Sequence, residues 1–230
     1  MPVAAMAVVG AVIVICGLGV LFWPVLVLCK IFGGCDGGGG SDGVSFNEHD
    51  LIAAFRGDGQ GPLNARVVPK HLVKPIRDAG KLCDQIGPIV IASQIDYESH
   101  FNKKFVGPDG AEGISQVPPD AFKEFGKDDD NNGDISALDP KDSIMAQGRY
   151  LCDLADKVDQ LRASGQITGD ALNLTLAAYD SGLATVKQHK GVPKTSEAQS
   201  YIVGIRSRFA LYGGAVHVPS NAPTPLPTSF

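Results

Sequence analysis

The chain has 230 residues, of which 44% are hydrophobic, and it carries 25 acidic residues against 20 basic ones. This length fits one medium-sized domain with attached segments, and no region is basic enough to indicate binding to nucleic acid. The acidity is concentrated, because residues 128–142 contain six Asp and one Lys. A local cation site is therefore favoured over a generally acidic surface.

The N-terminal residues 3–29 contain no charged side chain. At ~1.5 Å per residue, a helix of this length exceeds the ~30 Å hydrocarbon core of a bilayer. The sequence therefore predicts one transmembrane helix, tilted or kinked near Pro24. A cleavable signal peptide is disfavoured, since its apolar region would be shorter and would follow a basic start. Lipid anchoring at Cys35, after Phe32-Gly-Gly, is an alternative that also tethers the chain to a membrane.

Four further segments follow this predicted span. Residues 30–46 are a Gly-rich flexible linker, and residues 47–66 predict a short helix and a loop of no assigned role, with Asn47 as N-cap. In residues 67–212, apolar side chains recur at helical spacing without a competing strand pattern. An all-α (mainly α) domain is therefore expected there, and the Pro-rich residues 213–230 are expected to be disordered.

The helices expected within this domain are each marked by spaced apolar residues. They comprise a helix with Leu72, Ile76 and Ala79, a helix within residues 89–101, a short helix opened by Pro118-Pro119, a long helix from Ile144 to Leu161, a helix with Leu172, Leu176 and Tyr179 interrupted at Gly182, and a last helix from Tyr201 to Tyr212.

Two of the five cysteines, Cys83 and Cys152, lie in the predicted domain. If the domain is exported, a disulfide between them would close a loop of about 70 residues and stabilise the fold by roughly 4 kcal/mol in the chain-entropy model. Two buried free thiols are the alternative. Their spacing excludes a CxxC site, and the five His show no metal-ligand spacing.

An acidic side chain, Glu98, falls on an apolar helix face. Ile91 and Ile95 are four residues apart and Glu98 follows three residues later, so all three share one face. Burial raises the pKa of a carboxyl group. Glu98 is therefore either satisfied by a neighbouring donor or kept protonated as a general acid near neutral pH.

Three motifs occur in a characteristic order: Glu98-Ser99 ending an apolar helix, Ala111-Glu-Gly-Ile-Ser-Gln116 before a Pro-initiated helix, and Ala177-Ala-Tyr-Asp-Ser-Gly182. Together they resemble the lytic transglycosylase domain, which is related to goose-type lysozyme, over about residues 67–212. The resemblance implies a lysozyme-like α-helical domain whose groove binds glycan strands of peptidoglycan.

The resemblance also implies the chemistry, with Glu98 as the sole essential catalytic residue and no cofactor required. Glu98 would protonate the glycosidic oxygen between N-acetylmuramic acid and N-acetylglucosamine. As a carboxylate, it would then take the proton of the muramic acid 6-hydroxyl, closing a 1,6-anhydro ring without water. An internal nucleophile removes the need for the second carboxylate that glycosidases ordinarily use.

The candidate substrate-binding residues share the motif segments or the last predicted helix. The resemblance suggests that Gln116 and Tyr179 hydrogen-bond the substrate or Glu98, with a capping Gln and a core Tyr as the alternative. Ser99 is expected to orient the site and not to act as a nucleophile, because no His partner is nearby. The full set is Ser99, Ser115, Gln116, Tyr179, Asp180 and Tyr201.

Two positions depart from the family pattern. Asp180 stands where Asn is usual, and Ser115 stands where many members have Met or Thr. If Asp180 lies near Glu98, its charge would raise the pKa of Glu98 or hold a water for hydrolysis; if it points to solvent, the change is neutral. The alternatives are therefore a lysozyme-type muramidase and a non-catalytic glycan-binding module of an envelope-spanning machine.

The acidic segment from residue 128 to residue 139 matches an EF-hand loop at positions 1, 3, 5, 6, 9 and 12. Asp at position 12 replaces the usual Glu. A structural calcium ion is expected, and the alternative is a solvated loop whose Asp139 caps the helix begun by Pro140. The predicted ligands are Asp128, Asp130, Asn132, Asp134, Ser136 and Asp139.

The expected location is the cell membrane, with a single span and the catalytic domain extracytoplasmic, facing the cell wall. Lys30 alone gives the positive-inside rule too little to assign orientation, so this side follows from the function. The expected partners are peptidoglycan glycan strands, the bilayer through residues 3–29 and, as a further candidate, an envelope-spanning secretion or conjugation machinery.

Overall fold

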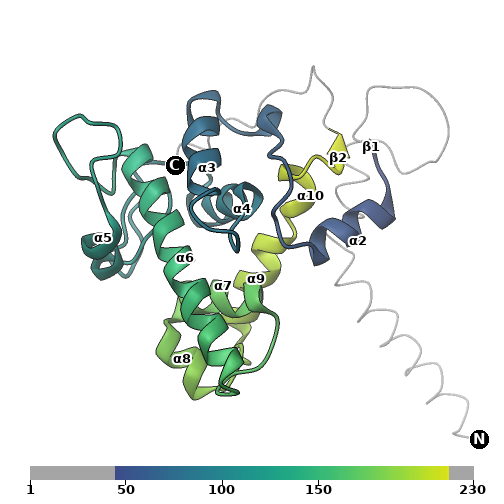
Figure 1. The fold of residues 1–230 in the computed structure, drawn as a ribbon. Helices are drawn as coiled ribbons and strands as arrows, with labels where there is room; N and C mark the ends of the chain where they lie inside the picture. Colours follow the sequence, from purple (N-terminus) through teal and green to yellow (C-terminus); the bar gives the residue numbers. More distant parts are fainter. Residues whose placement is uncertain (1–44, 218–230) are drawn as a thin grey trace, which may run out of the picture. The chain divides into compact units, whose positions relative to one another are not determined.

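In the computed structural model, the described part of the chain runs from residue 45 to residue 217 (Figure 1). The predicted transmembrane helix of residues 3–29 lies outside it, as do residues 30–44 of the linker and residues 218–230 of the tail. Residues 46–216 belong to one unit. Within the described residues, no helix is long and apolar enough to cross a membrane.

The described chain is mainly helical, as predicted from the spacing of its apolar residues. Two short 3-10 turns, Ala65–Val67 and Lys70–Leu72, precede α3, and two-residue strands β1 (Ser45–Phe46) and β2 (Val216–His217) pair with each other. The helices are α2 (Glu48–Arg56), α3 (Val73–Ala79), α4 (Pro88–Ser99), α5 (Pro119–Phe125), α6 (Pro140–Ala163), α7 (Ala171–Ser181), α8 (Leu183–Gln188), α9 (Ser196–Arg206) and α10 (Phe209–Tyr212).

Most helices begin at local capping signals. Asn47 accepts a hydrogen bond from the backbone N–H of His49, as expected for the N-cap of α2. Asp170 and Thr195 cap α7 and α9 in the same way. Helices α4, α5 and α6 each have Pro in the first turn, where the missing N–H costs no helical hydrogen bond.

The prediction of a single last helix from Tyr201 to Tyr212 is wrong. The chain forms α9 and α10, with a break at Ser207 and Arg208. The Gly204 carbonyl accepts hydrogen bonds from Ser207 Oγ at 2.8 Å and Arg208 Nη1 at 2.6 Å. In a continuous helix this carbonyl would accept the backbone N–H of Arg208, which instead donates to Ile205. Side-chain competition for one carbonyl therefore ends α9.

The long helix α6 lies at the centre of the packing. It contacts α3, α5 and α7 and also touches α4 (Figure 1). Its core-facing residues Ile144, Leu151 and Val158 are fully buried. A disulfide between Cys83 and Cys152 joins the segment after α3 to α6, which confirms the predicted pairing.

The N-terminal segment of residues 47–66 is bound to the helical domain through the buried Arg206 of α9. The Arg206 guanidinium donates to the carbonyls of Phe55 and Gly57 at 3.0 and 2.9 Å, and it also pairs with Asp170 at 2.7 Å. A segment to which the sequence assigned no role thus contributes to the fold.

Strand β2 falls within residues 213–230, which were predicted to be disordered. Just before it, the backbone N–H of Asn64 donates to the Tyr212 carbonyl at 2.7 Å. Backbone pairing of this kind leaves no apolar pattern in the sequence, which explains why the predicted tail begins too early.

Reducing the Cys83–Cys152 disulfide should lower the free energy of unfolding by about 4 kcal/mol, because 69 positions separate the two cysteines. This corresponds to a fall in Tm of about 10 °C. Thermal melts with and without reductant measure it. The double variant Cys83→Ser/Cys152→Ser is the control, since reductant should not change its Tm. Equal melting of oxidised and reduced wild type would contradict the expectation.

Candidate active site

The acidic residue Glu98 is the penultimate residue of α4 and is partly exposed. Ile91 and Ile95 on the same face are fully buried, as the spacing predicted. Directly after α4, His100 and Phe101 both adopt positive φ angles, of 50° and 62°. Two consecutive non-glycine residues in this region form a strained turn, a feature that is enriched at functional sites.

Glu98 accepts a hydrogen bond from a residue far away in the sequence. The Tyr201 hydroxyl on α9 donates to Glu98 Oε1 at 2.5 Å across 103 positions of sequence. Tyr201 is buried, and its ring meets the Tyr97 ring edge-on with 5.1 Å between the centroids. The structure therefore brings the predicted site residue Tyr201 into direct contact with Glu98.

Burial dominates the titration of Glu98 and raises its pKa to about 7. The hydrogen bond from Tyr201 opposes this shift because it stabilises the carboxylate, whereas the charges of Asp180 and Asp109 add to it. The two roles considered for Glu98 thus coexist, since the carboxyl group has a neighbouring donor and still holds its proton near neutral pH.

The loop of residues 111–117 is closed by the side chain of Gln116. Gln116 has a φ of 47°, and its amide nitrogen donates to the carbonyls of Gly113 at 2.8 Å and Phe105 at 3.1 Å. A Cβ on Gly107 would lie 2.6 Å from Gln116 Oε1, so a larger residue there would displace the Gln116 amide. The side-chain N–H groups of Gln116 therefore cap backbone within the loop.

Two other predicted residues hold this loop in place, and a third, Ser115, lies within it and supplies a backbone carbonyl. Ser99 Oγ on α4 donates to the Ile114 carbonyl at 2.6 Å, and the Tyr179 hydroxyl on α7 donates to the Ser115 carbonyl at 2.8 Å. Ser99, Tyr179 and Ser115 are all buried. The hydroxyl groups of Ser99 and Tyr179 join α4 and α7 to the loop beside Glu98, which is an orienting role, whereas Ser115 Oγ has no hydrogen-bond partner among the described residues.

Asp180, the predicted departure from the family pattern, is exposed at the C-terminal end of α7. Its charge raises the pKa of Glu98. Although the residue as a whole is exposed, partial desolvation of its carboxyl group and the charge of Glu197 raise its own pKa. Asp180 thus satisfies both conditions that the sequence left open: it faces solvent and it acts electrostatically on Glu98. Asp109 acts in the same direction, and no motif indicated it.

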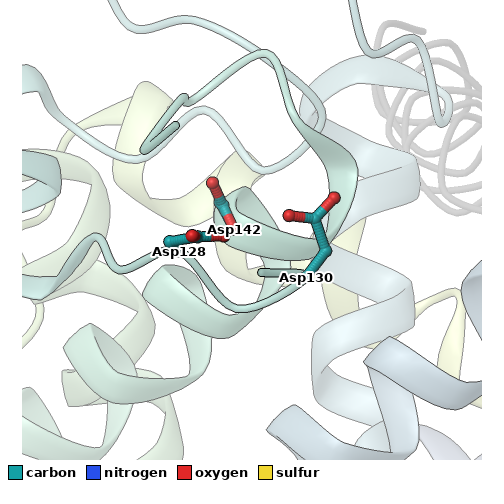
Figure 2. Close-up of side chains that lie close together, drawn as sticks. All are labelled: Asp128, Asp130 and Asp142. Atoms are coloured by element: carbon teal, nitrogen blue, oxygen red, sulfur yellow. The ribbon is translucent and has the colours of Figure 1, made fainter. Parts of the chain in front are cut away.

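The acidic loop gathers three carboxylates at the start of α6. Oxygens of Asp128, Asp130 and Asp142 lie within 4.8 Å of one another, and Figure 2 shows the three side chains converging. Asp142 is buried and accepts the backbone N–H groups of Asp129 at 2.8 Å and Ser136 at 3.1 Å. It therefore also fastens the loop to α6.

Asp139, the ligand predicted at position 12 of the loop, is absent from this cluster. Its carboxylate caps α6 by accepting the backbone N–H groups of Lys141 and Asp142, which is the alternative role considered for it. Of the other predicted ligands, Asn132 Oδ1 accepts from Asp134 N at 2.8 Å, and Ser136 Oγ accepts from Leu138 N at 3.2 Å. The motif did not indicate Asp142 because it lies three positions beyond the loop, in the first turn of the helix.

Two glutamines that the sequence analysis missed lie behind Tyr201. Gln94 Nε2 donates to the Tyr201 hydroxyl oxygen at 2.7 Å, and Gln147 Nε2 on α6 donates to Gln94 Oε1 at 2.7 Å. Both side chains are fully buried. The spacing held a signal, because Gln94 precedes Glu98 by four residues and Gln147 lies between Ile144 and Leu151 on the buried face of α6.

A family model described as the transglycosylase SLT domain matches residues 80–202, which is more than half of the chain. The match includes Glu98 and all three motif segments. It is narrower than the predicted limits of residues 67–212, and it begins near the end of α3.

Substituting Glu98 by Gln should change how stability depends on pH. The pKa of Glu98 is about 7 in the folded chain against 4.5 ordinarily, so its contribution to stability is present below pH 4.5 and is lost as pH rises through about 7. Between pH 4 and pH 8, wild type should therefore lose about 3 kcal/mol of unfolding free energy relative to Glu98→Gln.

Urea denaturation at several pH values measures this difference. Glu124→Gln, at an exposed glutamate of α5, is the matched control and should follow wild type at every pH. Parallel curves for wild type and Glu98→Gln would show that Glu98 titrates normally.

Proposed function

The chain belongs to the transglycosylase SLT family, and from this membership we propose that it is a lytic transglycosylase that cleaves the β-1,4 bond between N-acetylmuramic acid and N-acetylglucosamine in peptidoglycan. The observation that carries the proposal is the Glu98 carboxyl group, whose pKa burial raises to about 7 beside a single tyrosine donor. Near neutral pH about half of such groups are protonated, so one residue serves first as acid and then as base.

In the first step, protonated Glu98 transfers its proton to the glycosidic oxygen. The bond from the muramic acid anomeric carbon to that oxygen breaks, N-acetylglucosamine leaves as an alcohol, and positive charge develops at the anomeric carbon. The resulting carboxylate is stabilised by the hydrogen bond from Tyr201, which lies at 2.5 Å.

In the second step, the Glu98 carboxylate accepts the proton of the 6-hydroxyl group of the same muramic acid. The 6-oxygen bonds to the anomeric carbon and forms the 1,6-anhydro ring. The proton returned to Glu98 restores the enzyme, so no water is consumed and no cofactor is needed. A second carboxylate acting as nucleophile is likewise unnecessary.

A lysozyme-type hydrolase is the second candidate, and Asp180 is the observation that favours it. Its charge acts on Glu98 and its side chain is exposed, so it could hold a water molecule for attack at the anomeric carbon. A hydrolytic mechanism would leave a hydrated reducing end, which is chemically distinct from the anhydro product.

We further propose that the domain is extracytoplasmic and anchored through residues 3–29. The Cys83–Cys152 disulfide supports this location because disulfides persist in oxidising compartments. The uncharged N-terminal stretch supports a membrane anchor. An envelope-spanning secretion or conjugation machinery is a partner that would be compatible with such an anchor.

A structural calcium ion at the acidic loop is a separate proposal. Asp128, Asp130 and Asp142 offer three carboxylates within 4.8 Å, and hard oxygen donors of this kind suit Ca²⁺. Gly133, with a φ of 95°, occupies the sharp turn that an EF-hand loop requires. The ion would neutralise the mutual repulsion of these carboxylates and would leave the chemistry at Glu98 to the protein alone.

Digestion of purified sacculi, followed by mass spectrometry of the released muropeptides, tests the activity. Wild type should release 1,6-anhydro products that contain no ¹⁸O when the reaction is run in H₂¹⁸O, and Glu98→Gln should reduce release by at least about 10³-fold. Asp180→Asn should give the same anhydro products as wild type. Hydrated, ¹⁸O-labelled ends that disappear in Asp180→Asn would establish the hydrolase, and no release by wild type would indicate a glycan-binding module.

Calcium at about 100 times its dissociation constant should raise Tm by about 5–10 °C, and a chelator should reverse the shift. Asp130→Asn, at an exposed position, should abolish the shift. Asp139→Asn is the matched control and should retain it, because Asn also caps helices well. A wild-type Tm that changes with neither calcium nor chelator would contradict the proposed calcium site.

A further inference from the structure

Four side chains form a continuous hydrogen-bonded chain from the core to the site. Gln147 donates to Gln94 at 2.7 Å, Gln94 donates to Tyr201 at 2.7 Å, and Tyr201 donates to Glu98 at 2.5 Å. The residues come from α6, α4 and α9, and the first three are at most 4% exposed. Polar groups buried to this degree are costly unless they are paired. Gln94 and Tyr201 are paired on both sides, whereas Gln147 Oε1 has no hydrogen-bond partner among the described residues.

The chemistry of each group sets the direction of the chain. A glutamine amide has an oxygen that only accepts and a nitrogen that only donates. Gln94 Oε1 receives the N–H of Gln147, so Gln94 presents its NH₂ group to Tyr201. The Tyr201 oxygen receives that hydrogen, and its own O–H is left to point at Glu98 Oε1.

The consequence falls on the two oxygens of Glu98. Oε1 accepts from Tyr201. Because the carbonyl oxygen of a neutral carboxyl group is its stronger acceptor, this bond favours the proton of the neutral acid on Oε2. We propose that Gln94 and Gln147 are positioning residues that hold the Tyr201 hydroxyl directed at Glu98 Oε1, and thereby keep the acidic proton on Oε2, where it is free for transfer. This inference rests on the proposed role of Glu98 as the acid.

The observed direction of the hydrogen bonds prevents Glu98 from donating its proton to Tyr201. If both amides turned over, the Gln94 carbonyl would accept the Tyr201 hydrogen, and Glu98 could donate its own proton to Tyr201. That proton would then be held inside the protein and unavailable to a glycosidic oxygen. Reversal requires two fully buried amides to rotate together in a close-packed core, which opposes it.

Removing the Gln147 amide, which is the first donor of the chain, should allow the Gln94 amide to reverse its orientation. In Gln147→Met, Gln94 Oε1 has no partner, so the Gln94 amide can turn its carbonyl toward Tyr201. Tyr201 then has a second acceptor, the Glu98 carboxylate loses part of its hydrogen bond, and the pKa of Glu98 should rise by about half to one pH unit. Tyr201→Phe removes the bond altogether and should raise it at least as far.

A double variant distinguishes an effect of hydrogen-bond direction at Tyr201 from an effect of lost packing. In Gln94→Met/Gln147→Met, no carbonyl competes for the Tyr201 hydrogen, so Tyr201 again donates only to Glu98. The upward shift should then be smaller than in Gln147→Met, whereas a merely structural role predicts a double variant at least as perturbed as the single one. Thr175→Val, which removes a buried hydrogen bond of α7 outside this chain, is the control and should leave the titration unchanged.

The other groups that act on the Glu98 charge stay constant in these variants. They are Asp180 on α7 and the loop residue Asp109, and neither is substituted. Changes in titration can therefore be assigned to the Gln147-Gln94-Tyr201 chain.

Two measurements on the full chain test the proposal. Neutron diffraction of the deuterium-exchanged wild type should show deuterium on Tyr201 directed at Glu98 and the ND₂ group of Gln94 directed at Tyr201; a Gln94 carbonyl facing Tyr201 would overturn the proposal without any variant having to fold. In the variants, ¹³C NMR of the Glu98 carboxyl and the alkaline limb of kcat/KM should shift upward together.

A Gln147→Met protein that titrates like wild type would also overturn the proposal. The NMR titration reports on Glu98 whether or not Glu98 is catalytic. If the titration shifts as expected while Glu98→Gln still cleaves glycan, the proposed function fails and the directed chain stands. The failure of each proposal is therefore distinguishable from that of the other.

Discussion

Burial of the Glu98 carboxyl group against the Tyr201 hydroxyl is the interaction on which the rest of the site depends. Burial alone disfavours the carboxylate, and a hydrogen bond from Tyr201 alone would favour it. Because burial is the larger effect, the pKa settles near 7, where both protonation states are accessible. A fully solvated glutamate would not hold its proton at neutral pH. A glutamate paired with a cation would stay ionised and would not be protonated to act as the acid.

The scaffold supports this balance from several directions. Helix α4 presents Glu98 at its last turn, and α9 supplies Tyr201 from more than a hundred residues away. Ser99 and Tyr179 bond the backbone of the 111–117 loop, so they fix a neighbouring wall without presenting a reactive group. These contacts come from elements scattered along the chain, and the disulfide that links α6 to the segment after α3 secures the packing between them.

Local signals explain how much of this could be predicted from the sequence. Helical spacing placed Ile91, Ile95 and Glu98 on one face, and the capping residue Asn47 was identified correctly. Long-range features were not accessible in the same way. Tyr201 was a candidate substrate-binding residue, but its bond to Glu98 depends on helix packing. The break at Ser207 depends on side chains competing for one carbonyl. Asp142 joined the acidic cluster from a helix turn that the loop motif does not include.

The proposed role of Glu98 as the acid depends on the proton affinity of its carboxyl group in the intact protein. Titration of the wild-type Glu98 carboxyl carbon by ¹³C NMR, assigned by the signal that is lost in Glu98→Gln, measures it most directly. We expect an inflection near pH 7, at the pKa that burial confers. An inflection near 4.5, the ordinary value for glutamate, would contradict it, because Glu98 would then be ionised at neutral pH and unable to serve as the acid.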